Sequence, residues 1–341
     1  MAQPSKYKKN KSKIISTVIL IAILIAAVAG GIILIFFVKK EKKMDMTMAY
    51  STTELIYTNA IDSDMQMAKS FANTLCVGSD NTGHDGINLD NGEIGGLFSV
   101  DDRTILFANG IYDKIYPASI TKVMTAILAC KYGNMDDVVT ITWEDLELES
   151  GSQVCGFKIG DQVRMSELLH GLLIHSGNDA AMAIARHVGG TVAKFVTMMN
   201  EEAAKIGATS TNFMNPSGLH DENHYTTVYD IYLMLNEALN YPDFVSVMQI
   251  SVYDMTYTAA DGTEQHITLD STDHYLTKEI SAPKNVTVLG GKTGTTSIAG
   301  NCLALVSQNA YGKPYVSIVV RAQNKDILYD KMNSMLSQIN A

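Results

Sequence analysis

Cysteine is scarce in this sequence, and its few cysteines form no metal-binding pattern. The four cysteines stand far apart, and no two of them form a C-x-x-C pair. This spacing argues against a structural zinc site. Cys130 and Cys302 lie in apolar runs, which predicts buried thiols. An exported domain would also permit one disulfide.

Basic residues are scarce outside the N-terminal segment. Residues 1–43 hold nine lysines and one glutamate, whereas the rest of the chain carries 17 Lys and Arg against 35 Asp and Glu. The formal charge of this larger part is therefore −18. A domain this acidic argues against nucleic-acid binding, so we expect no nucleic-acid partner.

One uncharged run near the N-terminus is long enough to cross a membrane. As a helix, residues 14–38 would span about 37 Å, more than the roughly 30 Å of a bilayer's hydrocarbon core. A cleaved signal peptide is the alternative, because Ala27-Val28-Ala29 is similar to a cleavage site. The apolar part of a signal peptide is usually about 7–15 residues, so the longer run favours an uncleaved anchor in the lipid bilayer.

These features divide the chain into four parts. We expect a basic cytoplasmic tail over 1–13, a transmembrane signal anchor over 14–38, a juxtamembrane linker with an extra helix at 60–77 over 39–91, and a main domain over 92–341. Five lysines precede the apolar run and four follow it. The positive-inside rule therefore does not set the orientation.

The main domain has the pattern of strands, then helices, then strands and a final helix. Apolar and β-branched runs predict strands at 97–100, 104–108, 286–289, 302–307 and 315–321. Periodicity and capping residues predict helices at 119–132, 166–174, 179–188, 191–206, 227–239 and 324–339, and a capping box at Thr142-x-x-Asp145. This order predicts an α+β fold in which both ends of the domain build one sheet around a helical insert.

The first candidate site motif is Ser119-Ile-Thr-Lys122. A serine is a weak nucleophile and needs an adjacent base, and i, i+3 spacing on a helix places Lys122 on the same face as Ser119. Lysine serves as a base only if burial or a neighbouring cation lowers its pKa, and Lys292 is the expected cation. The same spacing recurs at Ser5–Lys8 and Ser281–Lys284, in a basic tail and a proline-broken loop.

A second motif, Ser176-Gly-Asn178, stands between two predicted helices. The Ser176 hydroxyl is expected to pass a proton between Lys122 and a leaving amine. Asn178 is expected to hold a substrate amide. The alternative is a simple helix cap, a role that Asp179 can also fill.

The third motif, Lys292-Thr293-Gly294, follows a predicted strand. Gly294 has no side chain, so a substrate peptide can pair with the strand edge. Lys292 and Thr293 are expected to bind the terminal carboxylate of that peptide. The backbone N–H groups of Ser119 and Thr295 are expected to form an oxyanion hole.

One further pattern has metal-like spacing but a poor context for metal binding. His220 and His224 are four residues apart, which on a helix can bind zinc. Gly218 and the turn residues around it argue against a helix there. We therefore expect no metal and no cofactor.

Together these residues resemble the D-alanyl-D-alanine carboxypeptidases, the serine-type, low-molecular-mass penicillin-binding proteins of peptidase family S11. The resemblance runs from about Gly92 to Ile339, and it includes the stretches 116–122, 160–161, 175–181, 215–219 and 291–296. It implies a β-lactamase/penicillin-binding transpeptidase-like fold, with an antiparallel sheet flanked by helices and a helical subdomain. The implied catalytic residues are Ser119, Lys122 and Ser176, and the implied substrate-binding residues are Asn178, Lys292, Thr293, Gly294 and Thr295.

The resemblance also implies an activity and a location. A family member would trim the terminal D-alanine of peptidoglycan stem pentapeptides through an acyl-Ser119 intermediate, and β-lactam antibiotics would acylate it. Because that substrate lies outside the cell membrane, we expect a single-pass membrane protein with an extracellular catalytic domain. Thr295 departs from many relatives, which carry an aromatic residue or histidine there. Many relatives also have a C-terminal β-rich domain and an amphipathic tail, and no segment of this sequence resembles either.

Three other interpretations stay open. A β-lactamase of this fold would need a glutamate in an E-x-x-L-N context, and Glu201-Glu202 is followed by no such pattern. A DD-endopeptidase would use the same residues as a carboxypeptidase. A non-catalytic wall-binding protein would predict a lost nucleophile or base, whereas this chain retains both.

Overall fold

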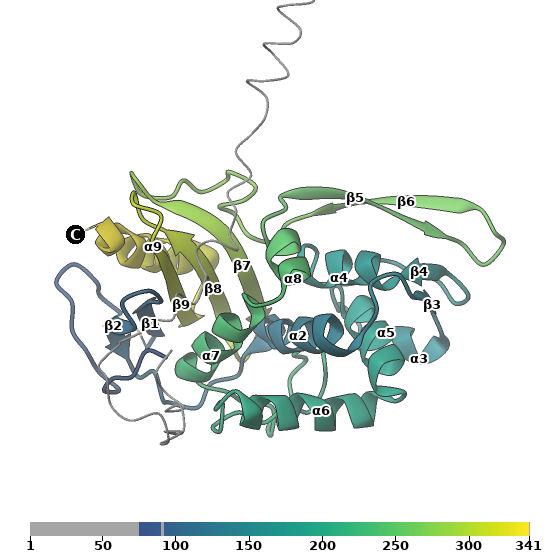
Figure 1. Cartoon of the computed structure of the whole chain (residues 1–341), viewed down its shortest axis with the longest axis horizontal. Helices are drawn as coiled ribbons and strands as arrows, with labels where there is room; N and C mark the ends of the chain where they lie inside the picture. Colours follow the sequence, from purple (N-terminus) through teal and green to yellow (C-terminus); the bar gives the residue numbers. More distant parts are fainter. Residues whose placement is uncertain (1–74, 90–91, 341) are drawn as a thin grey trace, which may run out of the picture. The chain divides into compact units, whose positions relative to one another are not determined.

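A five-stranded antiparallel sheet joins the two ends of the main domain (Figure 1). The computed structural model describes residues 75–89 and 92–340. The strand order is β2-β1-β9-β8-β7, with β1 (Ile94–Ser99), β2 (Thr104–Asn109), β7 (Thr287–Thr296), β8 (Gly300–Gln308) and β9 (Pro314–Ala322). Strand β9 pairs with β1 from Ile94↔Val320 to Ser99↔Tyr315. The five predicted strands, and the sheet built from both ends of the domain, are confirmed.

Helices fill the stretch between β2 and β7. They are α2 (Lys122–Tyr132), α3 (Trp143–Leu146), α4 (Met165–Leu173), α5 (Asn178–Gly189), α6 (Val192–Lys205), α7 (Val228–Ala238) and α8 (Pro242–Met248). The predicted helices are confirmed to within a few residues at their ends, and the capping box at Thr142 is present. Every residue from Lys122 to Ala129 is buried, so α2 forms the centre of this helical part.

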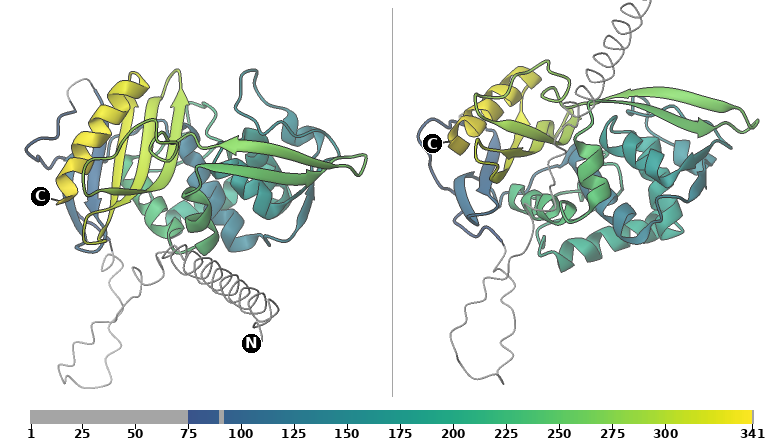
Figure 2. Two further views of the ribbon diagram at one scale, coloured as in Figure 1. Left: turned by 90° about the horizontal axis from the view of Figure 1, so that it is seen from above. Right: turned by 45° about the horizontal axis from the view of Figure 1, so that its top comes forward.

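Helices cover both faces of the five-stranded sheet (Figure 2). On one face, α9 (Lys325–Leu336), followed by a short 3-10 helix (Ser337–Asn340), packs its apolar side chains against the strands; the cluster includes Leu97, Leu303, Leu305, Val319, Leu328, Met332 and Met335. On the other face, the ring of Phe98 stacks on Tyr232 of α7 at 4.5 Å between centroids. Burial on both faces explains the nearly continuous apolar sequences of β8 and β9.

A second antiparallel sheet has the order β3-β4-β5-β6, with β3 (Val138–Thr140), β4 (Gln162–Arg164), β5 (Val252–Thr258) and β6 (Glu264–Asp270). Strands β4, β5 and β6 were not predicted from the sequence. The long β5–β6 hairpin buries only Met255 and Leu269 from its two strands. An exposed hairpin is held mainly by its own pairing, so its sequence carries a weak hydrophobic signal.

Most predictions for the N-terminal region fall on residues that are not described. The predicted anchor at 14–38 lies outside the described residues, and among those that are described no helix is long and apolar enough to cross a bilayer. The predicted helix over 60–77 is described only from residue 75, and residues 75–77 are not helical. Within the described stretch 75–89, Thr82 pairs with Ala108 of β2, so the chain around Thr82 contacts the sheet. The domain boundary at 92 stays a prediction.

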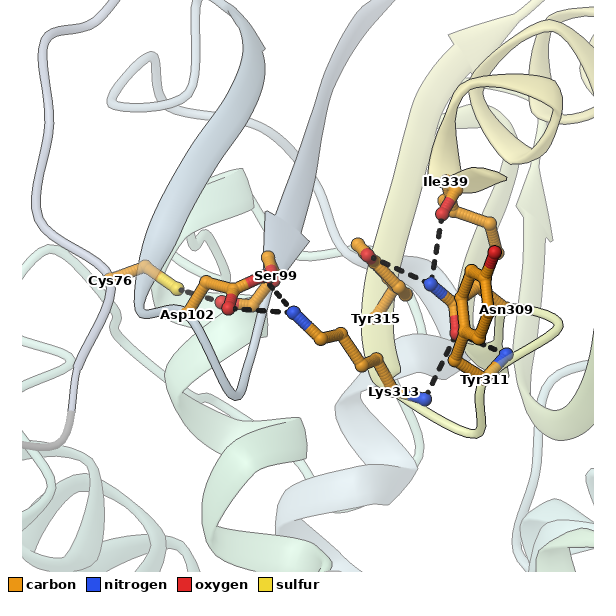
Figure 3. A network of polar contacts seen from close by, with 8 residues as sticks. All are labelled: Cys76, Ser99, Asp102, Asn309, Tyr311, Lys313, Tyr315 and Ile339. Carbon is orange, nitrogen blue, oxygen red and sulfur yellow. Dashed lines mark hydrogen bonds and ion pairs between the residues drawn. The ribbon is translucent and has the colours of Figure 1, made fainter. Parts of the chain in front are cut away.

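The turn between β8 and β9 is held by the side chain of Asn309 (Figure 3). Its Oδ1 accepts hydrogen bonds from the backbone N–H groups of Tyr311 and Lys313, at 2.9 and 3.1 Å. Its Nδ2 donates to the carbonyl of Ile339 at 3.2 Å, and Lys313 Nζ lies 3.0 Å from Asp102. These contacts fasten the C-terminal helical turn to the β8–β9 hairpin, and the β8–β9 hairpin to the β1–β2 hairpin.

All four cysteines are free thiols. Cys302 is buried, as predicted, whereas Cys130 is only partly buried. Cys76 lies in the segment before the sheet, where its thiol donates to the Ser99 carbonyl at 3.3 Å. Cys155 is buried and packs close to Gly171 and Gly177.

Candidate active site

Ser119 lies in a 3-10 turn (Ala118–Thr121) directly ahead of α2. The sequence predicted an α-helix from Ser119, but the α-helix begins at Lys122. The turn is strained, because Ala118 has a φ of 47°, in the left-handed region that favours glycine. Such strain is common where a catalytic side chain must be held in one orientation. The turn thus presents Ser119 at the start of a buried helix.

Lys122 reaches Ser119 from the first turn of that helix. Its Nζ lies 3.1 Å from Ser119 Oγ, 2.6 Å from Asn178 Oδ1 and 2.7 Å from the Ser217 carbonyl. The lysine is fully buried. Asn178, predicted to hold a substrate amide, therefore also fixes the lysine. The Ser217 carbonyl comes from a stretch in which the sequence indicated only a turn.

Burial sets the protonation of Lys122. Loss of hydration and the nearby Lys292 ammonium hold the pKa of Lys122 well below its usual value, against the opposing effect of Asp179. A lowered pKa favours the neutral amine, which is the form a general base requires. The predicted effect of Lys292 on Lys122 is thus present, although burial is the larger cause.

Ser176 lies in a tight turn before α5 and lines the same cavity as Ser119. Its φ is 63°, so this residue too is in the left-handed region. Its Oγ is buried and has no hydrogen-bond partner in the described part of the chain. Asp179, one turn on, accepts N–H bonds from Cys155, Gly156 and Ala180, each at 2.9 Å. This ties the segment before α4 to the start of α5 and fixes the Ser176 turn.

Strand β7 carries Lys292, Thr293, Gly294 and Thr295 along the edge of the sheet beside Ser119. A Cβ atom on Gly294 would lie 3.0 Å from both Pro117 O and Ser119 N, so a side chain here would push the strand and the Ser119 turn apart by a few tenths of an ångström. Lys292 is buried, and burial lowers its pKa to about 7, against the opposing effect of Asp273. Its Nζ donates to the Thr293 carbonyl at 3.0 Å.

A cavity of about 610 Å³ opens over these groups. Six of the eight predicted site residues line it, namely Ser119, Ser176, Asn178, Thr293, Gly294 and Thr295. Lys122 and Lys292 are buried behind this lining, as shown by their contacts with Asn178 and Thr293. The structure therefore brings all three motifs to one site, while the separate role of each residue stays a prediction.

The cavity also contains residues that the sequence analysis missed. The segment 149–153 lines it, and so do Lys325 and Tyr329 of α9. Outside the lining, Asp273 is buried and raises the pKa of Lys292. None of these residues belongs to a recognisable motif, so only the tertiary structure assigns them to the site.

The histidine pair is not arranged as a helix. Residues 220–224 form an irregular turn, and His220 packs edge-on against Tyr116. Both ring nitrogens of His224 have partners, since Nε2 lies 2.8 Å from Thr121 Oγ1 and Nδ1 accepts from Met214 N at 3.2 Å. His224 therefore fastens the turn beneath the Ser119 segment.

Comparison with known proteins agrees with this geometry. The model of the peptidase S11 family, D-alanyl-D-alanine carboxypeptidase, matches residues 98–324. The D-alanyl-D-alanine carboxypeptidase DacF of Bacillus subtilis is 37% identical over 150 residues, which cover 42% of this chain and 38% of that protein. DacC of Escherichia coli, of the same description, is 30% identical over 235 residues, or 66% of this chain and 55% of that protein.

A solved structure shows the same fold. The crystal structure of the Streptomyces K15 DD-transpeptidase aligns with a TM-score of 0.66 at 24% identity, covering 71% of this chain and 94% of that one. The fold is thus that of the DD-transpeptidases, with antiparallel sheets and a helical subdomain. The chain belongs to the peptidase S11 family. It spans about half the length or less of the two curated carboxypeptidases that it matches.

Proposed function

We propose that this chain is a serine-type D-Ala-D-Ala carboxypeptidase that trims the terminal D-alanine of peptidoglycan stem pentapeptides. One observation carries the proposal: a buried lysine of lowered pKa lies 3.1 Å from a serine hydroxyl at the floor of a 610 Å³ cavity. Family membership supplies the substrate class.

The contacts of Lys122 support its role as the base. A neutral lysine amine has two N–H groups and one lone pair. Asn178 Oδ1 and the Ser217 carbonyl are both acceptors, so they take the two N–H groups. The lone pair is then left for the Ser119 hydroxyl, the third neighbour of Nζ. As Ser119 Oγ bonds to the carbonyl carbon of the penultimate D-alanine, its proton passes to Lys122.

Ser176 supports the next step. Its unpartnered hydroxyl is free to carry the proton from Lys122 to the amine of the departing D-alanine as the peptide bond breaks. Water then attacks the acyl-Ser119 ester and releases the shortened peptide. In this scheme Lys292 and Thr293 bind the terminal carboxylate, and the N–H groups of Ser119 and Thr295 bind the developing oxyanion. A β-lactam acylates Ser119 by the same attack.

We also propose that the protein is a single-pass membrane protein with its catalytic domain outside the cell. The uncharged run at 14–38 and its flanking lysines support this proposal. The location of the proposed substrate supplies the orientation.

The deciding experiment labels the full-length protein with a fluorescent penicillin and repeats the labelling with Ser119→Ala. Stable labelling of the wild type and none of the variant is expected. Absence of wild-type labelling would contradict the acyl-serine mechanism. Equal labelling of the variant would show that a residue other than Ser119 is the nucleophile. Rapid loss of the label with turnover would instead identify a β-lactamase. Release of D-alanine from a pentapeptide, compared with cleavage of a cross-linked dimer, separates a carboxypeptidase from an endopeptidase.

A further inference from the structure

Two buried lysines, Lys122 and Lys292, share the site, and each is nine-tenths or more buried. The proposed mechanism needs Lys122 neutral and Lys292 charged. Burial disfavours the ammonium form of both, and the charge of Lys292 further lowers the pKa of Lys122. The two amines therefore compete for one proton, and something in the fold must direct that proton to Lys292.

A buried carboxylate stands near each lysine, but the two carboxylates differ in their hydrogen bonds. Asp179, on the side of Lys122, accepts three backbone N–H bonds that offset its charge. Asp273, on the side of Lys292, accepts one, from Tyr275 N at 2.9 Å. Its Oδ2 is buried and has no partner among the described residues. The negative charge of Asp273 thus remains available to Lys292.

The turn that carries Asp273 is fastened to β7 and to α9. The hydroxyl groups of Thr272 and Thr293, the neighbours of Asp273 and Lys292, lie 2.5 Å apart. On the other side, His274 N donates to the Tyr329 hydroxyl at 2.9 Å, and the Tyr275 hydroxyl donates to Asn333 Oδ1 at 2.9 Å. These contacts fix the turn that carries Asp273, and its carboxylate acts on Lys292 through its charge, without a direct hydrogen bond or ion pair between the two in the described structure.

We infer that Asp273 is a positioning residue that keeps the shared proton on Lys292 and so leaves Lys122 neutral as the base, an inference that rests on the proposed function. Asp273 is not among the residues that line the cavity. It acts on the reaction through Lys292, which is expected to hold the substrate carboxylate.

The charged surroundings agree with this role. The charge of Lys292 acts on Lys122 of α2 and on Asp273, and the charge of Asp273 acts on Tyr275 of its own turn and on Tyr329 of α9. Both tyrosines have raised pKa values, so they stay neutral near pH 7. Outside this group, Lys325, His274 and Glu279 form a partly exposed chain of polar contacts.

The Asp273 carboxylate itself titrates close to neutral pH. Burial raises the pKa of Asp273 to about 6, and Lys292 has a pKa of about 7. Above pH 6 the charged carboxylate favours the ammonium of Lys292. Without that carboxylate, Lys292 would lose its proton at a lower pH.

The test measures the rate of acylation by benzylpenicillin between pH 5 and 9 in the full-length wild type and in Asp273→Asn. The amide keeps the bond from Tyr275 N but carries no charge. We expect the alkaline limb of the profile to move down by about 1 to 3 pH units, the effect of one nearby opposite charge. Asp270→Asn, at an exposed position on β6, is the matched control and should leave the profile unchanged.

An unchanged pH profile of acylation in Asp273→Asn overturns the inference and leaves the proposed function standing. A wild type that is not acylated overturns both. If Asp273→Asn fails to fold, nuclear magnetic resonance of ¹³Cε-lysine-labelled wild type decides, with the Lys292 signal assigned from Lys292→Gln. A charged Lys292 and neutral Lys122 near pH 7 support the inference, and the reverse distribution overturns it.

Discussion

Gly218 lies so close to Ala118 that a Cβ atom on the glycine would stand 1.9 Å from the Ala118 carbonyl oxygen. Gly218 also has a φ of +87°, which L residues rarely adopt. The residue before the nucleophile is thus held by a glycine about a hundred positions further along the chain. This contact links the turn at 215–219 to the strained turn that carries Ser119.

Gly218→Ala should therefore damage both the fold and the reaction. We expect it to lower the free energy of unfolding by about 3 kcal/mol, because backbone must move as well as adopt a strained φ. Gly312→Ala is the control, since Gly312 has a similar φ of +79° but open space around its Cα. The control should cost only about 1 kcal/mol. Urea unfolding and penicillin labelling measure both, and equal losses would show that the contact with Ala118 does not matter.

Lys122→Met should leave the core filled and remove the base. Acylation by penicillin should fall by about 10² to 10⁴, the usual contribution of a general base. Lys284→Met is a suitable control, because Lys284 shares the serine spacing in sequence but is exposed. A Lys122 variant that is acylated as fast as the control would rule out this lysine as the base.

Ser176→Ala should separate activity from stability. Its hydroxyl has no partner in the described structure, so its loss should change the free energy of unfolding by less than about 1 kcal/mol. Turnover of a D-Ala-D-Ala peptide should nevertheless fall by about 10² or more, because the proton relay is lost. Ser317→Ala removes another buried hydroxyl for which no partner is seen in the described region, and Ser317 does not line the cavity. It should preserve turnover, and a Ser176 variant that does likewise would contradict the relay.

His224 should make the protein sensitive to acid. Burial lowers the pKa of His224 to about 4, below the roughly 6.5 expected in the unfolded chain. As pH falls, the unfolded state therefore binds the proton before the folded state does. The contribution of neutral His224 to the free energy of unfolding is fully present above pH 6.5 and is lost as pH falls towards 4. This group alone should cost about 3 kcal/mol over that interval.

Urea unfolding at several pH values in the wild type and in His224→Gln measures this cost. The variant should lose less stability between pH 7 and pH 4 than the wild type. His266→Gln, at an exposed position, should behave like the wild type. The raised pKa of Asp273 works in the opposite direction in all three proteins, so their differences isolate His224. Parallel curves for wild type and His224→Gln would refute the assignment.

Local sequence signals located the three motifs on their elements but missed part of the fold. The strands around Lys292 and the helix after Ser119 carry strong apolar patterns, so they were predicted. The β5–β6 hairpin buries little, and its pattern was too weak to predict. The 3-10 turn at Ser119 was also missed, because its strain depends on a distant glycine.

The sequence by itself determined the family, the α+β order and the residue types of the site. Motif chemistry and hydrophobic periodicity depend on residues close together in sequence, so both can be recognised without knowledge of the fold. Only the tertiary structure decided that Asn178 and the Ser217 carbonyl fix Lys122, and that Asp273 stands beside Lys292. Burial and the contacts between distant segments set the charge of each lysine, and neither can be read from residue order alone.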